Sequence, residues 1–565
     1  MSTTVTSTAT FGMDAFASLA VVPSASDTRG TITFTSAAPN SRVPSFSAKL
    51  QAKEFGPFLA PMTVSIVVED GSCTYQLTGH AGGYSYDSSN NVTGLVGPDG
   101  ELMQIGREMS YMASVLSQPS RQMSGRGNPG ILVTDFTSAA SWSVATGTPT
   151  LTQDYSGYDS NGAITGIAPR TGIASMLKMV PSSDSSEEIQ NTSLTAVATS
   201  GIFGLWVYVE AQPGFEAGVG VGTGTIGVLM STSSSSFSNA LQISFIATGF
   251  REGWNFLKYN ENADASHGGP GHPDGINRTL NGTGANGDII NTTVKRIKVI
   301  TTTLFGATVY LDSIWTGYST QSAIVLGSDA NGTDFTTYAL PLFQQYGWER
   351  KGYLAVPRRV WSSGTKVVSD WTVPKAVVDT AYAAGFEVLN HTVNHLANGA
   401  LTDAGQVAYE LEACRGWALG KGWLRGSNFY VSPQFSTSRL AQAVAQSLGF
   451  LMQRHARKWN IARTPWGIDN PNYIGSIDMG QASQGWQQYS TIKAAIDKCV
   501  AYGDSLWLFW HSITALGDPG TGEGTTGDDL LIYLSNFQAV LAYIASLEAA
   551  GTIDVLSPTE FYYGE

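Results

Sequence analysis

From about residue 318 to the C-terminus, short apolar runs alternate with segments of helical periodicity. The runs are "AIVLG", "GYLAV", "FEVLN", "NFYVS", "FLMQR", "LWLFW" and "IDVLS". Strands that alternate with helices are typical of a mostly parallel sheet, because each crossover helix returns the chain to start the next strand in the same direction. Residues 318–565 are therefore predicted to form an α/β domain, a distorted TIM-like (β/α)7 barrel that lacks one strand.

The segments between these runs set the expected helices. Helices are predicted over 336–346, 372–384, 402 onward, 440–448 and 491–502, and a last one is predicted to carry Leu530, Leu534, Phe537, Leu541 and Ile544. In the second helix, Thr372 would cap the first turn and Gly385 would end the last.

The first 317 residues predict a different, all-β organisation, so the chain is expected to be multidomain. Polar and apolar residues alternate in short runs that are broken by glycine-rich turns. We expect a β-rich module over 1–130 and a β-sandwich of jelly-roll or concanavalin-like type over 131–317. Four tryptophans of the sandwich fit either a sugar-binding surface or the core: Trp142, Trp206, Trp254 and Trp315.

Charge and hydropathy exclude several classes of partner. The net charge is −13, with no basic cluster, which argues against nucleic acid or an anionic membrane as the main partner. No stretch approaches the roughly 18 apolar residues of a membrane span, and the N-terminus lacks the basic start of a signal peptide. We therefore expect the protein to be made in the cytoplasm and not to insert into a membrane. Cys73, Cys414 and Cys499 lie far apart, and we expect buried thiols.

Polar residues that can carry chemistry follow three of the predicted strands. Asp329 follows "AIVLGS", His391 and His395 follow "FEVLN", and His511 ends "LWLFW". In such barrels the working residues gather where strands end. Histidines four apart on a helical face project the same way, and two imidazoles with one carboxylate suit a Zn²⁺-like ion. By itself the histidine pair is a weak signal, since helix starts often carry histidine.

The order of motifs resembles the NodB-type polysaccharide deacetylases of carbohydrate esterase family four. "SDANGTDFTTYALPLFQQYGWERKGYLAV" is similar to that family's first signature, "GFEVLNHTVNHLA" to its His-[Ser/Thr]-x-x-His signature, "FYVSPQFSTSRLAQAVAQSLGF" to the third and "LWLFWHSI" to the final Leu-x-x-His element. The resemblance covers about 318–565.

The resemblance implies an activity and a set of roles. Asp329, His391 and His395 would bind a divalent metal ion, expected to be Zn²⁺, and His511 would be the general acid that protonates the departing amine. Pro433 and Trp510 would contact the substrate. The reaction would be hydrolysis of an N- or O-acetyl group on a polysaccharide, with the metal polarising the carbonyl and activating water.

Two departures from the family pattern bear on catalysis. The family's base aspartate is replaced by Ser328, and its orienting arginine is replaced by Val431. Serine does not accept a proton near neutral pH, and a general base contributes about 10²–10⁴ in rate. Three interpretations stay open: another carboxylate substitutes, with Asp334 the first candidate and Asp469 the second; the enzyme is slow; or the domain binds glycans on an enzyme scaffold.

The domain order also resembles the tail fibres and tailspikes of bacteriophages. That resemblance implies a homotrimer on the virion tail, with residues 1–130 as the anchor and acetylated bacterial surface polysaccharide as the partner outside the cell. A cellular glycan-modifying enzyme or an adhesin is the rival class. This second resemblance is one of architecture alone and carries less weight than the motifs of residues 318–565.

Overall fold

The computed structural model describes ten strands within residues 1–126 and most of residues 127–563. The longer stretches outside the described residues are 96–126, 155–166, 212–224, 261–275, 282–292, 359–374 and 456–462. In the described part of the chain, no helix is long and apolar enough to cross a membrane.

The N-terminal module consists of two four-stranded antiparallel sheets and a hairpin. One sheet has the order β1 (Ser2–Val5), β8 (Cys73–Thr78), β3 (Ser18–Pro23), β6 (Lys53–Phe55), and the other β2 (Thr8–Met13), β7 (Met62–Asp70), β4 (Arg29–Ser36), β5 (Phe46–Lys49). β9 (Tyr84–Tyr86) pairs with β10 (Val92–Leu95). Ile32, Val64 and Ile66 are fully buried, so alternate residues of β4 and β7 face a core.

The next segment folds into two six-stranded antiparallel sheets. The first contains β14 (Thr150–Asp154), β15 (Met176–Val180), β25 (Ala307–Thr316), β18 (Ile202–Ala211) and β21 (Gly253–Asn260), and β12 (Ile131–Thr134) pairs with β25. The second has the order β13 (Ser143–Thr146), β16 (Glu187–Asn191), β24 (Arg296–Thr302), β19 (Thr225–Ser231), β20 (Ala240–Ile246), β22 (Ile276–Asn281).

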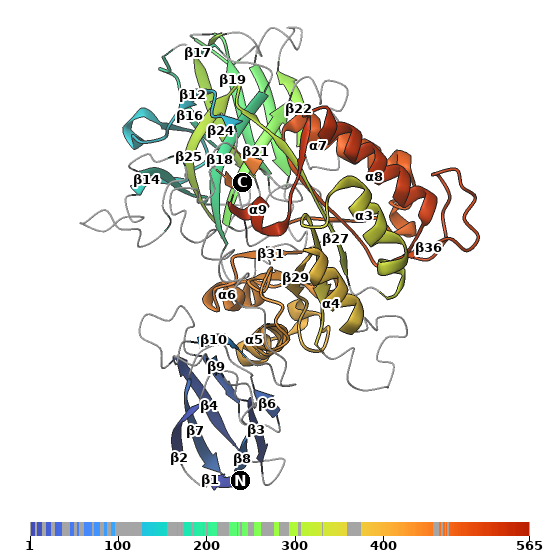
Figure 1. Cartoon of the computed structure of the whole chain (residues 1–565). Coiled ribbons are helices and arrows are strands. Elements are labelled where there is room, and N and C mark those ends of the chain that lie inside the picture. The colour runs from blue at the N-terminus through green and yellow to red at the C-terminus, as the bar shows by residue number, and fades with distance from the viewer. Residues whose placement is uncertain are drawn as a thin grey trace.

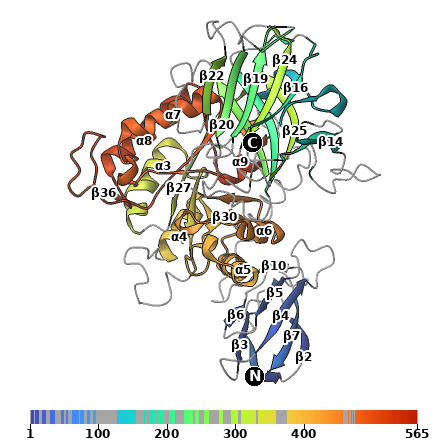
Figure 2. The ribbon, with the colours of Figure 1, turned by 180° about the vertical axis from the view of Figure 1, so that it is seen from behind.

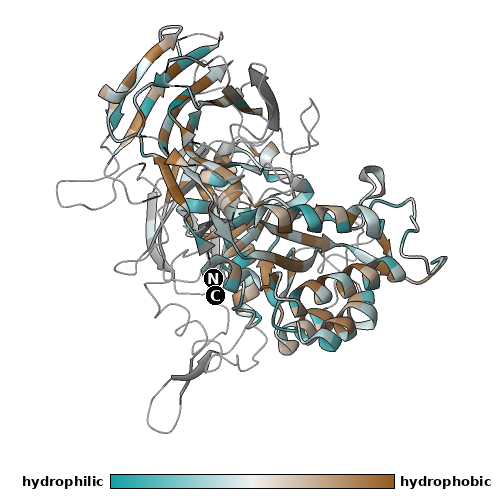
Figure 3. Cartoon of the chain, turned by 90° about the horizontal axis from the view of Figure 1, so that it is seen from above, coloured by the Kyte–Doolittle hydropathy of each residue, from teal (hydrophilic) through white to brown (hydrophobic). Residues whose placement is uncertain are grey.

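One apolar core joins the two sheets into a sandwich. Val207 and Leu311 of the first sheet pack in the same cluster as Val228 and Val299 of the second. Figure 3 shows hydrophilic and hydrophobic residues alternating along these strands, as a sheet with one buried face requires. Trp142 is 6% exposed and belongs to this core, whereas Trp206 is 0% exposed and packs with Phe256 and Tyr318 in a separate cluster.

A curled parallel sheet forms the centre of the C-terminal domain. Its order is β31 (Met452–Arg454), β30 (Phe429–Val431), β29 (Glu387–Asn390), β28 (Gly352–Val356), β27 (Ser322–Asp329), β35 (Ser505–Trp510), β34 (Ile477–Asp478), and β38 (Ile553–Val555) also pairs with β27. An isolated parallel bridge joins Arg454 to Ile474, just before β34. The two edges therefore approach each other, and the sheet is consistent with a TIM-like barrel.

Helices cover the outer face of this sheet (Figures 1 and 2). They are α3 (Leu340–Tyr346), α4 (Lys375–Ala384), α5 (Ala404–Gly420), α6 (Arg439–Ser447), α7 (Tyr489–Tyr502) and α8 (Leu534–Ala549), and a π-helical turn over Phe335–Ala339 leads into α3. The last helix, α9 (Pro558–Tyr563), packs differently, because its Phe561 contacts Trp507 in the cluster on the other face of the sheet. β36 (Ser512–Thr514) and β37 (Leu531–Tyr533) form a small parallel pair after β35.

The parallel strands have two differently packed faces. Along β27, Ile324 and Leu326 pack in the core beneath the helices, and Ala323 and Val325 pack in the cluster on the opposite, inner face. Successive side chains of a strand point to opposite faces, so the parity of a residue decides whether it can reach the inside of the barrel.

All seven apolar runs predicted as strands are strands, and three other predictions need correction. β34 is an additional strand that the sequence did not predict. The segment that carries the histidine pair is a loop. Leu530 lies before β37 and α8 begins only at Leu534. The first residues of the predicted 372–384 helix lie outside the described residues. Within the described residues, α4 starts at Lys375.

The sandwich and the barrel are joined by polar contacts at their junction. Lys258 of β21 forms an ion pair with Asp504, which precedes β35. Thr320, in the segment that leads from the sandwich into β27, donates through its Oγ1 to the carbonyl of Gly503 at 2.5 Å. Lys258 shares the parity of Trp254 and Phe256, so the outer face of the first sandwich sheet is turned toward the barrel.

Candidate active site

Three parallel strands bring the predicted functional residues to one edge of the sheet. Asp329 is the last residue of β27, His391 directly follows β29, and His511 directly follows β35. Because these strands are parallel, their carboxyl ends lie at the same edge, which is where α/β barrels place their reactive groups.

The two histidines lie close together, but in a loop rather than on a helix. Their ring centroids are 4.7 Å apart and the rings are nearly perpendicular. Thr392 and His395 have φ of 70° and 54°, a region that non-glycine residues rarely adopt. The Asn390 side chain accepts a hydrogen bond from the Thr392 backbone N–H at 2.9 Å. This local turn replaces the first turn of the predicted helix.

His391 is held with one ring nitrogen prepared to accept a ligand. Its Nδ1 lies 2.9 Å from the Val431 carbonyl. Since a carbonyl can only accept, Nδ1 carries the proton and Nε2 keeps its lone pair. Nε2 is buried without a hydrogen-bond partner among the described residues. Burial is the main cause that lowers the pKa of His391 to about 3, so the ring is neutral near pH 7.

His395 is neutral for related reasons. Burial, followed by the nearby His391, lowers the pKa of His395 to about 3. Two neutral imidazoles in contact form a pair of the type that binds divalent transition ions.

Asp329 has a partner that the sequence did not indicate. Its Oδ2 accepts from Arg454 of β31, and Arg454 Nη1 also donates to the Tyr353 hydroxyl at 2.6 Å. The guanidinium lies over the Phe509 ring, 4.0 Å from its centroid. Oδ1 of Asp329 is buried with no hydrogen-bond partner among the described residues. An arginine therefore reaches this edge from β31, the strand after the one that carries Val431.

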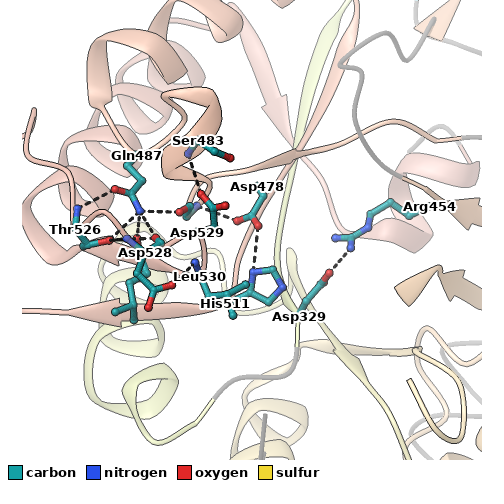
Figure 4. Close-up of polar contacts among 12 residues, drawn as sticks. Asp329, Arg454, Asp478, Ser483, Gln487, His511, Thr526, Asp528, Asp529 and Leu530 are labelled. Atoms are coloured by element: carbon teal, nitrogen blue, oxygen red, sulfur yellow. Dashed lines mark hydrogen bonds and ion pairs between the residues drawn. The ribbon is translucent and has the colours of Figure 1, made fainter. Parts of the chain in front are cut away.

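His511 is paired with a second residue that the sequence did not indicate, Asp478 of β34 (Figure 4). Its Nδ1 lies 3.2 Å from Asp478 Oδ2, and the other carboxylate oxygen accepts from the Gly480 N–H at 2.8 Å. Burial lowers the pKa of His511, but the charge and hydrogen bond of Asp478 outweigh it and the pKa is raised above its ordinary value. His511 is thus kept protonated to higher pH, as a general acid requires.

Gln487 ties the segments around this pair together. It is 1% exposed, and its Nε2 donates to the Gly480 carbonyl at 2.7 Å and to Thr526 Oγ1 at 2.9 Å. The Ser512 N–H donates to the Leu530 carbonyl at 3.0 Å. These bonds connect the chain beyond Asp478 to the loop that follows His511 (Figure 4).

Ser328 and Trp510 lie on the helix-covered face of the sheet. Ser328 is 0% exposed, and its neighbours across the sheet are Leu354 and Trp510, both members of the core beneath the helices. Ser328 thus points away from the inner face that Asp329 reaches. Trp510 was predicted to contact substrate, and the structure places it fully buried against Phe343 and Phe537, on the face away from Asp329.

The remaining candidates lie at the rim or outside the described residues. Asp334 Oδ2 accepts from the Ile513 N–H at 2.8 Å, which puts it beside the strand after His511. Burial raises the pKa of Asp334 despite backbone hydrogen bonds that lower it. Pro433 is buried at the start of a 3-10 turn, and its neighbour Gln434 is exposed. Asp469 lies outside the described residues.

The donor chemistry of the histidine pair fits a divalent metal ion. A metal-binding histidine commonly donates its second ring N–H to a carbonyl, as His391 does. In the part of the chain that the structure describes, no three His, Cys, Asp or Glu side chains lie close enough together to hold an ion. Asp329, the expected third ligand, is engaged by Arg454 through one oxygen and keeps the other unpaired.

No family model matches the chain, and no curated protein matches it. Among solved structures, a family 4 carbohydrate esterase from Streptomyces lividans in complex with acetate is similar at 16% identity over 40% of this chain and 89% of that one, with a TM-score of 0.24.

Two further solved structures are similar to this chain. A CE4 family pseudoenzyme from Bacillus anthracis shows 12% identity and a TM-score of 0.28, and the match covers 43% of this chain and 66% of that one, just under two thirds. A family 11 carbohydrate-binding module from Clostridium thermocellum, bound to a β-1,3-1,4-mixed-linked tetrasaccharide, shows 11% identity over 34% of this chain and 98% of that one, with a TM-score of 0.22. Likenesses this remote assign no family, so the functional assignment depends on residues and geometry.

Proposed function

We propose that residues 318–565 form a NodB-type deacetylase domain, a metal-dependent hydrolase that removes acetyl groups from a bacterial surface polysaccharide. The observation that carries the proposal is the pair of neutral histidines, His391 buried and His395 half-buried, at the same sheet edge as a histidine whose protonated form a carboxylate stabilises. His391 and His395 have the properties of metal ligands, and His511 has those of a general acid.

Different residues of the chain would have different roles in such a reaction. His391, His395 and Asp329 would hold the ion, which is expected to be Zn²⁺. A bound ion of this kind polarises an acetyl carbonyl and lowers the pKa of water. His511, oriented by Asp478, donates the proton that the departing amine or alcohol needs. General acid catalysis of this kind contributes about 10²–10⁴ in rate.

A carboxylate must accept the proton of the attacking water, and residue 328 is a serine, so another residue must supply that carboxylate. Asp334 is the first candidate, because burial makes its carboxyl group more basic and its bond to Ile513 places it near His511. Asp469 is the second candidate.

A glycan-binding domain without catalysis is the second candidate function. The observation that favours it is the placement of Ser328, which is fully buried and turned toward the helices. With no carboxylate at the expected base position, the edge with the histidine pair would hold acetylated sugar without turning it over.

We further propose that the chain is part of a phage tail fibre or tailspike, a homotrimer made in the host cytoplasm that acts outside it. An all-β module and a sandwich in front of a domain of this type support the proposal, with residues 1–130 as the anchor. Mass spectrometry of purified virions of a phage that encodes the chain tests this context. Absence of the chain from tails would overturn it.

Acetate release by the purified protein tests the activity. Metal-loaded and metal-stripped protein are compared on acetylated surface polysaccharide and on chitooligosaccharide, alongside His391→Ala and His511→Ala. We expect metal-dependent release by the wild type, loss of metal and activity in His391→Ala, and loss of activity with retained metal in His511→Ala. Stoichiometric metal in His391→Ala would overturn the ligand assignment, and binding of glycan without release would establish the second candidate function.

A further inference from the structure

The loop that carries the histidine pair is tied to a buried carboxylate on the neighbouring helix. Glu410 of α5 is 3% exposed. Its Oε2 accepts from the Asn394 backbone N–H at 2.8 Å, and its Oε1 accepts from the Asn394 side-chain amide. Asn394 directly precedes His395 in the chain.

The loop needs such an anchor because its conformation is unfavourable by itself. Positive φ at Thr392 and His395 is a backbone conformation that non-glycine residues keep only where the surrounding structure holds them in it. Asn390 fixes the first half of the loop through the Thr392 N–H and through its own bond to the Leu411 carbonyl at 2.7 Å. Glu410 fixes the second half. Both anchors are made with α5, so this helix sets the shape of the loop.

We propose that Glu410 is a positioning residue that sets the His395 ring against His391 by clamping Asn394. The inference rests on the proposed metal-dependent function of the same site. Because Asn394 offers two donors, the clamp needs an acceptor on each Glu410 oxygen. A glutamine at 410 would present an N–H group to one of these donors and leave the loop without one of its two bonds.

The same helix supplies a matched control. Glu412 is 2% exposed and pairs with Arg415, which also donates to the Leu448 carbonyl at 2.9 Å. Glu410 and Glu412 therefore have the same residue type, helix and burial, but only Glu410 bonds to the histidine loop. Glu412→Gln disturbs a buried charge pair without touching Asn394.

The experiment compares wild type, Glu410→Gln, Glu412→Gln and the double variant Glu410→Gln/Asn394→Asp. In the double variant, the glutamine introduced on α5 can donate to the aspartate introduced in the loop and still accept from the backbone N–H of position 394. The clamp is thus rebuilt with reversed polarity. Two readouts are used: amide hydrogen exchange of residues 391–396 in metal-free protein, and affinity for Co²⁺ with the absorption spectrum of the complex.

We expect Glu410→Gln to speed exchange at residue 394 and to weaken Co²⁺ binding about 10–100-fold, the usual effect of losing a group that orients a metal ligand. The double variant should recover both, and Glu412→Gln should change neither. Unchanged exchange in Glu410→Gln would overturn the positioning role whether or not metal binds. Failure of the wild type to bind Co²⁺ would instead overturn the metal site of the proposed function, while exchange still decides the role of Glu410.

Discussion

At the scale of single residues, Arg454 and Asp329 form a buried ion pair at the edge of the barrel that carries the candidate site. The side chains are 1% and 4% exposed. Breaking such a pair leaves an uncompensated charge in a medium of low polarity, which typically costs about 3–5 kcal/mol. The pair is therefore a condition of folding as well as a feature of the site.

Arg454→Met should lower the free energy of unfolding by about 3–5 kcal/mol, measured by urea denaturation. Lys375→Ala removes one partner of an exposed pair with Asp379 and should change stability by at most about 0.5 kcal/mol. Equal effects of the two substitutions would contradict the buried pairing.

Asp478→Asn should move the pH at which His511 loses its proton to a lower value. His511 has a raised pKa because the Asp478 carboxylate outweighs burial, and asparagine removes the charge. Activity that needs protonated His511 is lost as pH rises through its pKa, so the alkaline limb of the pH–rate profile should shift toward acid. The His511 ring resonance, followed by NMR as a function of pH, checks the shift without activity.

At the scale of elements, most strands of the barrel can be predicted from the sequence, but the short strand β34 and the loop that carries the histidine pair cannot. The seven apolar runs stood out because strands buried on both faces read as continuous apolar sequence. β34 has only two residues and lies after a long segment without a clear pattern. No sequence pattern therefore indicates that Asp478 lies at the end of a strand. The spacing of the two histidines predicts a helix, because spacing alone does not show that Asn390 and Glu410 offer the backbone other hydrogen bonds.

The C-terminal helix α9 depends on a buried carboxyl group that titrates. Glu387, the first residue of β29, accepts from the Thr559 N–H at 3.1 Å, and burial is the main cause that raises its pKa to about 7 from 4.5. The folded state thus holds this proton more tightly than the unfolded chain. The stabilising contribution is full below about pH 4.5 and is lost as pH rises through about 7.

Glu387→Gln should therefore flatten the dependence of stability on pH. Glutamine keeps an acceptor for Thr559 but does not ionise. The variant should match the wild type near pH 4.5 and exceed it above pH 7 by up to about 3 kcal/mol, at 1.36 kcal/mol for each pKa unit. Chemical denaturation across this range measures it, and parallel curves for the two proteins would refute the linkage.

At the scale of the whole molecule, an ion pair with little exposure joins the described parts of the sandwich and the barrel. The side chains of Lys258 and Asp504 are 6% and 13% exposed, and Asp504 lies between α7 and β35 in the chain. The contact lies between two separate apolar cores, that of the barrel and that of the sandwich. Cooperative unfolding of the two domains is the expected consequence.

Lys258→Met should uncouple the two domains. Calorimetry should resolve two transitions where the wild type shows a single one for these domains. Lys298→Met removes a comparable pair with Glu188 inside the sandwich and should lower stability without separating the transitions. A single transition in Lys258→Met would show that the ion pair does not couple the domains.

The direction in which the outer sandwich face points also decides how sugar binding by the sandwich can be tested. Trp254, Phe256 and Lys258 share that face, and Lys258 meets the barrel. A truncated protein ending at residue 317 would lack Tyr318 and Asp504 and would expose aromatic rings that the full chain packs. Exposed tryptophans bind many sugars and detergents weakly, so glycan arrays probed with the excised sandwich would report a surface created by the truncation.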